Sequence, residues 1–158
     1  MMTKRVACLL LASLCMGMAL GGCTLPPRDE MVNEIKGYTL PADVIRGRGL
    51  IYVIDDSHTS FSLNKDVLLD GEDDTAKIGS LSPGTYIFFP VLPGYHRIKM
   101  PQLSPYEIVI EVEEGDIIFL QPDTGRGRKN SLIQIDGVMG RYYLKHLKPG
   151  DLLMSVDH

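Results

Sequence analysis

Residues 85–100 read TYIFFPVLPGYHRIKM, which is two short apolar runs on either side of a Leu-Pro-Gly sequence. The first run, 85–89, is rich in aromatic and β-branched residues, which favour strands. The Pro-Gly pair at 93–94 is typical of a turn, because proline fixes φ and glycine accepts a positive φ. In the second run His96 and Ile98 alternate with charged residues, as in a strand with one buried face. The stretch therefore predicts two strands separated by a turn.

The same pattern extends on both sides of this stretch. Turn residues separate further apolar runs at Asp70-Gly71, Ser82-Pro83-Gly84 and Glu114-Gly115-Asp116. We predict strands at 50–54, 60–63, 66–69, 76–80, 85–89, 96–100, 107–112, 117–121, 132–135 and 142–144. Many short strands with regular turns are typical of a β-sandwich. The fold class expected is all-β, as a single immunoglobulin-like or prealbumin-like β-sandwich over residues 49–158.

Proline should protect the free edges of these sheets, because it removes a backbone donor. We expect Pro90, Pro101 and Pro122 to have this role. The tail at 145–154 is ambiguous, and it is predicted as a final turn or strand.

Composition limits the class of protein. The 158 residues include 16 basic and 20 acidic side chains, for a formal charge of −4. This length suits one domain, and the acidic balance argues against a nucleic-acid-binding protein. Three cysteines exclude a disulfide-dense scaffold. The mean hydropathy of +0.03 is high for a chain with 23% charged residues, so one segment must be strongly apolar.

The N-terminus is that segment, and it carries the pattern of a secretory signal peptide. Lys4 and Arg5 precede an apolar run at 6–20. Such a run of about 7–15 residues is typical of a cleaved signal, and it is shorter than the ~20 residues that span a bilayer. The run ends in Leu20-Gly21-Gly22-Cys23, which resembles the lipobox of bacterial lipoproteins. We predict a lipoprotein signal peptide over residues 1–22.

The lipobox resemblance implies that Cys23 is the lipid attachment residue and carries three acyl chains. One myristoyl chain binds membranes only marginally, so three would hold the protein essentially permanently. Thr24 stands where an Asp would favour the inner membrane, so the resemblance implies the outer membrane, facing the periplasm. Cleavage leaves 136 of the 158 residues, and loss of the two early cations changes the formal charge from −4 to −6. The alternative is an ordinary cleaved signal with an incidental thiol at Cys23.

Residues 23–48 are predicted to be a lipidated, flexible tether, because they are rich in proline, glycine and mixed charge. About 25 disordered residues would span roughly 25–30 Å. Within the tether, residues 29–36 could form two turns of helix with Met31, Val32 and Ile35 on one side. A helix this short is marginal without packing.

Four short motifs follow one another in the predicted domain. They are Val67-Leu68-Leu69-Asp70-Gly71, Lys77-Ile78-Gly79-Ser80-Leu81, Gly84-Thr85-Tyr86 and Pro93-Gly94-Tyr95-His96. Their order resembles DUF2846, a lipoprotein-associated domain of unknown function, and is similar to the PEGA and carboxypeptidase-regulatory-like sandwiches. An acidic run at 72–74 departs from the pattern. The resemblance implies a β-sandwich lipoprotein domain without established catalytic residues.

His96 is the first candidate for chemistry. Alternation places it with Ile98 and Met100, opposite Tyr95 and Arg97. We expect a packed histidine with a hydrogen-bonded ring nitrogen, and a ligand-binding or catalytic His96 is the alternative.

Two polar stretches contain residue types that could bind a metal or act in catalysis. The acidic turn at 70–74 could offer oxygens to calcium, but its spacing does not match an EF-hand loop, so a solvated turn is expected. Asp55-Asp56-Ser57-His58 contains the residue types of a hydrolase triad. Neighbouring side chains on an extended chain point to opposite sides, so we expect a polar strand connection.

The loop Gly125-Arg126-Gly127-Arg128-Lys129 is compactly basic and could touch phosphates or an acidic partner. A solvated surface loop is expected, and recognition is the alternative. No pair of the four histidines has zinc-ligand spacing, so no metal and no cofactor are expected.

These features together favour a non-enzymatic outer-membrane lipoprotein that acts as a periplasmic binding or accessory module. The expected partners are the membrane, through the acyl chains, and an envelope protein, with no nucleic acid. Two alternatives remain, an envelope hydrolase or small-molecule sensor using His96 or Ser57-His58, and a structural spacer.

Overall fold

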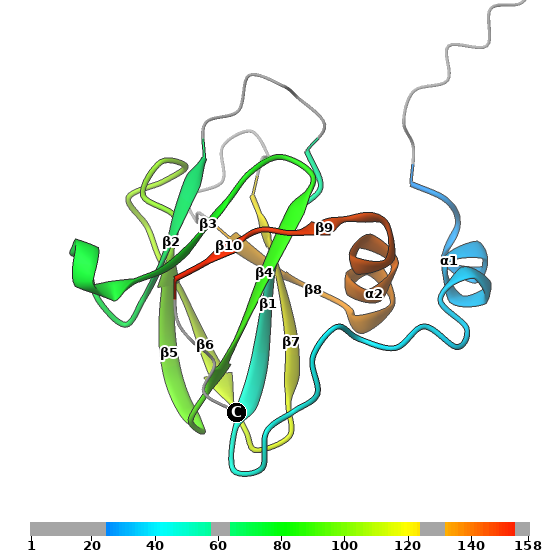
Figure 1. Cartoon of the computed structure of the whole chain (residues 1–158), viewed down its shortest axis with the longest axis horizontal. Coiled ribbons are helices and arrows are strands. Elements are labelled where there is room, and N and C mark those ends of the chain that lie inside the picture. Colours follow the sequence, from blue (N-terminus) through cyan, green and yellow to red (C-terminus); the bar gives the residue numbers. More distant parts are fainter. Residues whose placement is uncertain (1–24, 58–63, 124–131, 154–158) are drawn as a thin grey trace, which may run out of the picture.

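The computed structural model describes residues 25–57, 64–123 and 132–153, and these form a sandwich of two five-stranded sheets (Figure 1). Sheet A has the order β8-β7-β1-β4-β9, and sheet B has the order β10-β3-β2-β5-β6. Sheet A contains β1 (Gly49–Asp55), β4 (Thr85–Val91), β7 (Ile117–Pro122), β8 (Leu132–Ile135) and β9 (Lys148–Pro149). Sheet B contains β2 (Lys65–Leu69), β3 (Lys77–Leu81), β5 (Gly94–Lys99), β6 (Ile108–Val112) and β10 (Asp151–Leu152). The prediction of an all-β sandwich is confirmed, and the strand expected at 60–63 lies outside the described residues.

Three helical elements accompany the sheets. These are α1 (Arg28–Glu34), α2 (Gly137–His146) and the short 3-10 helix η1 (Asp74–Ala76). Among the described residues no helix is long and apolar enough to cross a membrane.

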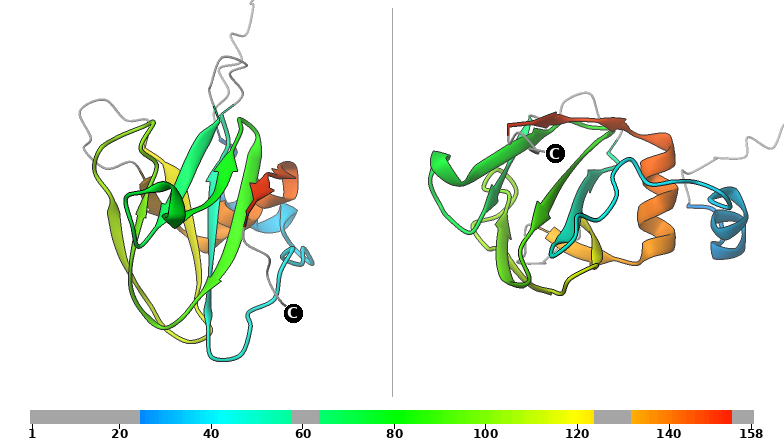
Figure 2. Two further views of the ribbon diagram at one scale, coloured as in Figure 1. Left: turned by 60° about the vertical axis from the view of Figure 1, so that its left-hand side comes forward. Right: turned by 60° about the horizontal axis from the view of Figure 1, so that its bottom comes forward.

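The central strand β1 explains the layering. All seven of its residues are buried, as expected for a strand covered on both faces. Its Ile51 and Val53 belong to the core between the sheets, whereas Tyr52 and Ile54 belong to a second core on the outer face of sheet A. Figure 2 shows α2 lying against that outer face, so the molecule has three layers.

Helix α2 corrects the strand predicted at 142–144. The Asp136 side chain caps the helix by accepting hydrogen bonds from the backbone of Val138 and Met139, which stabilises a helix start. The buried residues Gly140, Tyr143 and Leu144 follow the three- and four-residue spacing of a helix. The short aromatic run therefore belongs to a helix that packs on sheet A.

The C-terminal tail joins the two sheets. β9 pairs in parallel with β4 of sheet A, and β10 pairs antiparallel with β3 of sheet B. Between them the Gly150 amide donates to the Tyr86 carbonyl at 2.7 Å. The predicted final strand is present as two short pieces that cross from one sheet to the other.

The described part of the predicted tether, residues 25–48, makes contacts with the domain, and we call it the strap. Helix α1 lies beside α2 (Figures 1 and 2), with Met31 buried although Val32 is exposed. Farther on, the Tyr52 hydroxyl donates to the Ala42 carbonyl and accepts from the Ala42 amide. The strap also contributes apolar side chains to the outer core, namely Tyr38, Leu40, Ala42 and Val44.

The expected protection of sheet edges by proline fits sheet A, where two inner strands have a partner on one side only among the described residues. Pro90 of β4 pairs with β1, and β9 reaches only Thr85 and Tyr86. Pro122 of β7 pairs with β8, and the pairing with β1 ends at Leu120. Pro101 follows β5, which is also an inner strand. The last strand of sheet B is β6, and its sequence IVIEV contains no proline.

Candidate functional site

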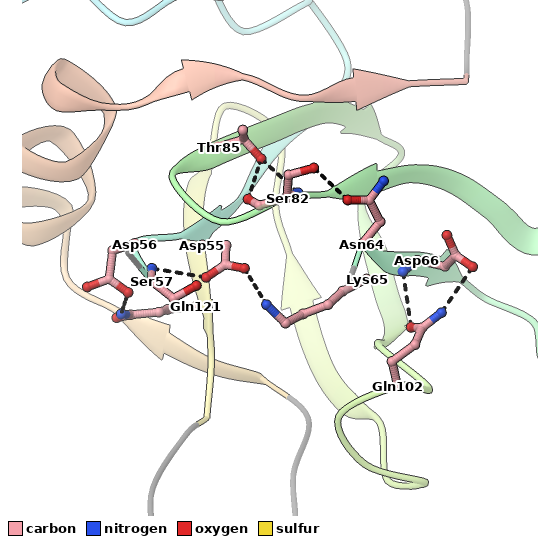
Figure 3. Close-up of polar contacts among 10 residues, drawn as sticks. All are labelled: Asp55, Asp56, Ser57, Asn64, Lys65, Asp66, Ser82, Thr85, Gln102 and Gln121. Carbon is pink, nitrogen blue, oxygen red and sulfur yellow. Dashed lines mark hydrogen bonds and ion pairs between the residues drawn. The ribbon is translucent and has the colours of Figure 1, made fainter. Parts of the chain in front are cut away.

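Polar side chains gather where β1 ends and β2 begins, at the stretch that contains the residue types of a hydrolase triad (Figure 3). Asp55 is 2% exposed, and its Oδ2 atom lies 2.5 Å from Nζ of the buried Lys65. The other carboxylate oxygen accepts from the Ser57 amide at 3.1 Å. Removing one partner of such a buried pair typically costs about 3–5 kcal/mol. The pair therefore holds the first strands of the two sheets together.

Asp56 points to a different neighbour. Gln121 of β7 donates to Asp56 Oδ1 at 2.7 Å. Burial raises the pKa of Tyr143 to about 12, with a further contribution from the charge of Asp56. Asp56 thus links the end of β1 to β7 and α2.

The Ser57 hydroxyl differs from the other polar groups of this cluster in its hydrogen bonding. Its Oγ atom is buried and has no hydrogen-bond partner among the described residues. Its sequence neighbour His58 lies outside the described residues. Since Lys65 is bonded to Asp55, the described residues do not bring a nucleophile and a base together as activation of a serine requires.

The remaining side chains in Figure 3 stabilise turns and strand ends. Ser82 and Thr85 close their turn through two hydrogen bonds of 3.0 and 2.7 Å. Ser82 also donates to Asn64 at 2.7 Å, and Gln102 exchanges two bonds with Asp66. These hydrogen bonds hold the turn before β4 and the start of β2 in place.

His96 lies in a second polar site, between the Asp-Gly turn and the Pro-Gly turn. Its Nδ1 atom is 2.7 Å from Asp70 Oδ2, and its Nε2 atom is 2.7 Å from the Leu92 carbonyl. A carbonyl and an ionised carboxylate only accept, so both bonds form only when the imidazole is protonated. Burial lowers the pKa of His96. The bonds to Leu92 and Asp70 and the charge of Asp70 raise it by more than burial lowers it, so the net pKa is above the ordinary value.

Asp70 is held in place by its neighbours. It has a φ of 54°. Its backbone amide donates to the Arg97 carbonyl at 2.8 Å, and the backbone amide of Arg97 donates to Asp70 Oδ1 at 2.7 Å. The His96 side chain is 13% exposed, and Ile98 and Met100 beside it are fully buried. The structure places His96 on the face that was predicted and gives it partners on both ring nitrogens.

Of the other candidate residues, the acidic turn at 70–74 is described by the structure, and the predicted lipid attachment residue and the basic loop are not. In the acidic turn, Asp70 is bonded to His96 and Asp73 caps η1 through Thr75. Within the described ranges, no group of three or more His, Cys, Asp or Glu side chains is placed to hold a metal. Cys23 and the basic loop 125–129 lie outside the described residues.

The outer face of sheet B carries a feature that the candidate motifs did not include. Tyr95 of β5 is 70% exposed and Val109 of β6 is 56% exposed. The pairing register places Tyr95 opposite Glu111 and Val109 opposite Arg97, so we call these four residues the edge patch. A hydrogen bond to Glu111 raises the pKa of Tyr95. The signal in the sequence was Val109, an apolar residue between two glutamates on the polar face of its strand.

Comparison of the chain with family models, with curated proteins and with solved structures finds no match in any of the three. The similarity to DUF2846 therefore stays a prediction.

Proposed function

We propose that this protein is a non-enzymatic lipoprotein of the bacterial envelope, and that an extended segment of an envelope protein binds along β6. The observation that carries this proposal is the edge patch, which lies on β6, the last strand of sheet B, and on its neighbour β5. An edge strand presents unpaired backbone N–H and C=O groups, and extended peptides bind such edges by adding a strand. The exposed Tyr95 and Val109 supply apolar contact area next to that edge.

The lipobox-like sequence ending at Cys23 supports the location, since it would anchor the chain to a membrane. The polar sites support a binding role over catalysis. Asp55 and Lys65 are bonded to each other, and both ring nitrogens of His96 have partners. These groups are occupied in holding strands together.

The test is copurification of the membrane-anchored protein after crosslinking in cells. We expect Val109→Lys to reduce capture of the partner, because a lysine on an edge strand opposes the addition of another strand. Ile45→Lys, at an exposed apolar residue of the strap, is the matched control and should leave capture unchanged. Hydrogen exchange should show protection of β6 amides in the complex. Equal capture by both variants, with no protection at β6, would overturn the proposal.

An envelope hydrolase or small-molecule sensor is the second candidate. The observation that favours it is the buried Ser57 Oγ, which has no hydrogen-bond partner within residues 25–57, 64–123 and 132–153. Turnover of an envelope substrate by the purified protein, abolished in Ser57→Ala, would establish the hydrolase and remove the binding module as the main function.

A further inference from the structure

The strap leaves little chain between the expected lipid anchor and the folded domain. Cys23 precedes the first residue of α1, Arg28, by five positions. A fully extended chain of that length spans at most about 18 Å. A disordered tether reaching to residue 48 would have allowed the domain to lie farther from the membrane in any orientation.

Contacts from both ends of α1 fix it on α2. At the start of α1, Arg28 forms an ion pair of 2.9 Å with Asp136, and this bond lowers the pKa of Asp136. At its end, the Glu34 carbonyl accepts from Lys145 at 2.7 Å, and the Glu34 carboxylate lies 2.7 Å from His146. Met31 is buried between these contacts. The position of α1 is therefore the position at which the domain is tied to its anchor.

We infer that the α1–α2 side of the domain rests on the lipid surface, with sheet B facing away from it. This inference depends on the proposed function, because it requires acylation of Cys23. Two apolar side chains of the anchoring segment, Leu25 and Val32, are 47% and 46% exposed and would meet the interface. Figure 1 shows α1 on one side of the molecule and β5 and β6 on the other, so the edge patch is presented to the periplasm.

Attraction to charged headgroups is not the cause of this orientation. Helix α1 has one basic and three acidic side chains, and α2 has two basic and no acidic ones. The two helices together therefore carry no net formal charge that would attract an anionic membrane surface. The short covalent connection enforces the contact. The orientation should therefore change little with salt or with the fraction of anionic lipid.

The experiment uses the full lipoprotein reconstituted in phospholipid vesicles. The mature chain is expected to have no free thiol, so Val32→Cys and Val109→Cys each introduce one site for a fluorescent label. A quencher attached to lipid headgroups should quench the label at residue 32 several-fold more than the label at residue 109. A flexible insertion of about 20 Gly and Ser residues after Thr24 would add roughly 25 Å of reach, and it should remove the difference.

The outcomes separate the two proposals. Equal quenching at both sites in vesicle-bound protein would overturn the orientation and leave the anchor intact. A difference that survives the insertion would overturn the short connection as the cause of the orientation. Protein that does not float with vesicles, and whose Cys23 carries no lipid by mass, would refute the anchor and with it the orientation.

Discussion

The outer face of sheet A is covered by other segments of the chain, whereas the outer face of sheet B is exposed to solvent. On sheet A, α2 and the strap cover the aromatic side chains, and Tyr52 and Phe119 are buried with stacked rings 5.4 Å apart. On sheet B, Tyr95 and Val109 stand in solvent. Both surfaces carry aromatic residues on strands, so residue type does not decide which is covered. The cover comes from segments before β1 and after β8.

The largest expected loss of stability comes from removing a large side chain from the covered face of sheet A. Phe119→Ala should lower the free energy of unfolding by about 3–5 kcal/mol, because it leaves a cavity under α2 and the strap. Chemical denaturation measures this loss. Tyr95→Ala on the open side is the matched control and should change stability by no more than about 0.5 kcal/mol. Comparable losses in the two variants would show that the two surfaces do not differ as described.

Helix α2 can also be pushed off sheet A. A Cβ at Gly140 would lie 2.3 Å from Cγ of Phe119, so Gly140→Ala should destabilise the protein by about 1–3 kcal/mol. Alanine within a helix ordinarily stabilises by about 1 kcal/mol relative to glycine, so the sign is diagnostic. Gly137→Ala is the control, because its Cβ would lie 3.0 Å from the flexible end of Arg141. A stabilised Gly140→Ala variant would contradict the close contact between α2 and sheet A.

In sheet B, on the inner face of β5, His96 makes stability depend on pH. Its pKa is raised above the ordinary 6.5 in the folded protein, so its contribution is complete below that value and is lost as pH rises through the folded pKa. The melting temperature of the wild type should therefore fall relative to that of His96→Gln across this range. A difference between the two that is constant with pH would contradict the doubly bonded imidazolium.

The smallest effect on stability is expected at the edge patch. Val109→Lys should change the free energy of unfolding by no more than about 0.5 kcal/mol, since Val109 is mostly exposed. Thermal denaturation measures this directly. A large loss would mean that Val109 has a structural role, and it would remove this variant as a probe of binding.

Much of the sandwich was predictable because alternation and turn residues are local signals. The runs at 85–89 and 117–121 were predicted as strands, and they lie within β4 and β7. Helix α2 was missed because Tyr142–Leu144 suits a strand when taken alone, and its cap at Asp136 lies six residues earlier. The contacts of the strap with the domain were not predicted, because proline and glycine indicate local conformation and do not show whether a segment packs against another part of the chain.

The candidate sites were predictable only in part. Alternation identified the face on which His96 lies, yet its partner Asp70 is 26 residues away in the sequence. The Asp55–Lys65 pair likewise depends on how β1 and β2 meet across the sandwich. Such contacts follow from sheet topology, which a single sequence does not specify.

Photo-crosslinking in intact cells compares the two sides most directly. A photoreactive residue is placed at Val109 on the open side or at Val32 on the strap, both of which are exposed. We predict a discrete protein adduct from residue 109 that is absent from residue 32. The same adduct from both positions, or no protein adduct from residue 109, would contradict a binding module that presents β6 away from its membrane anchor.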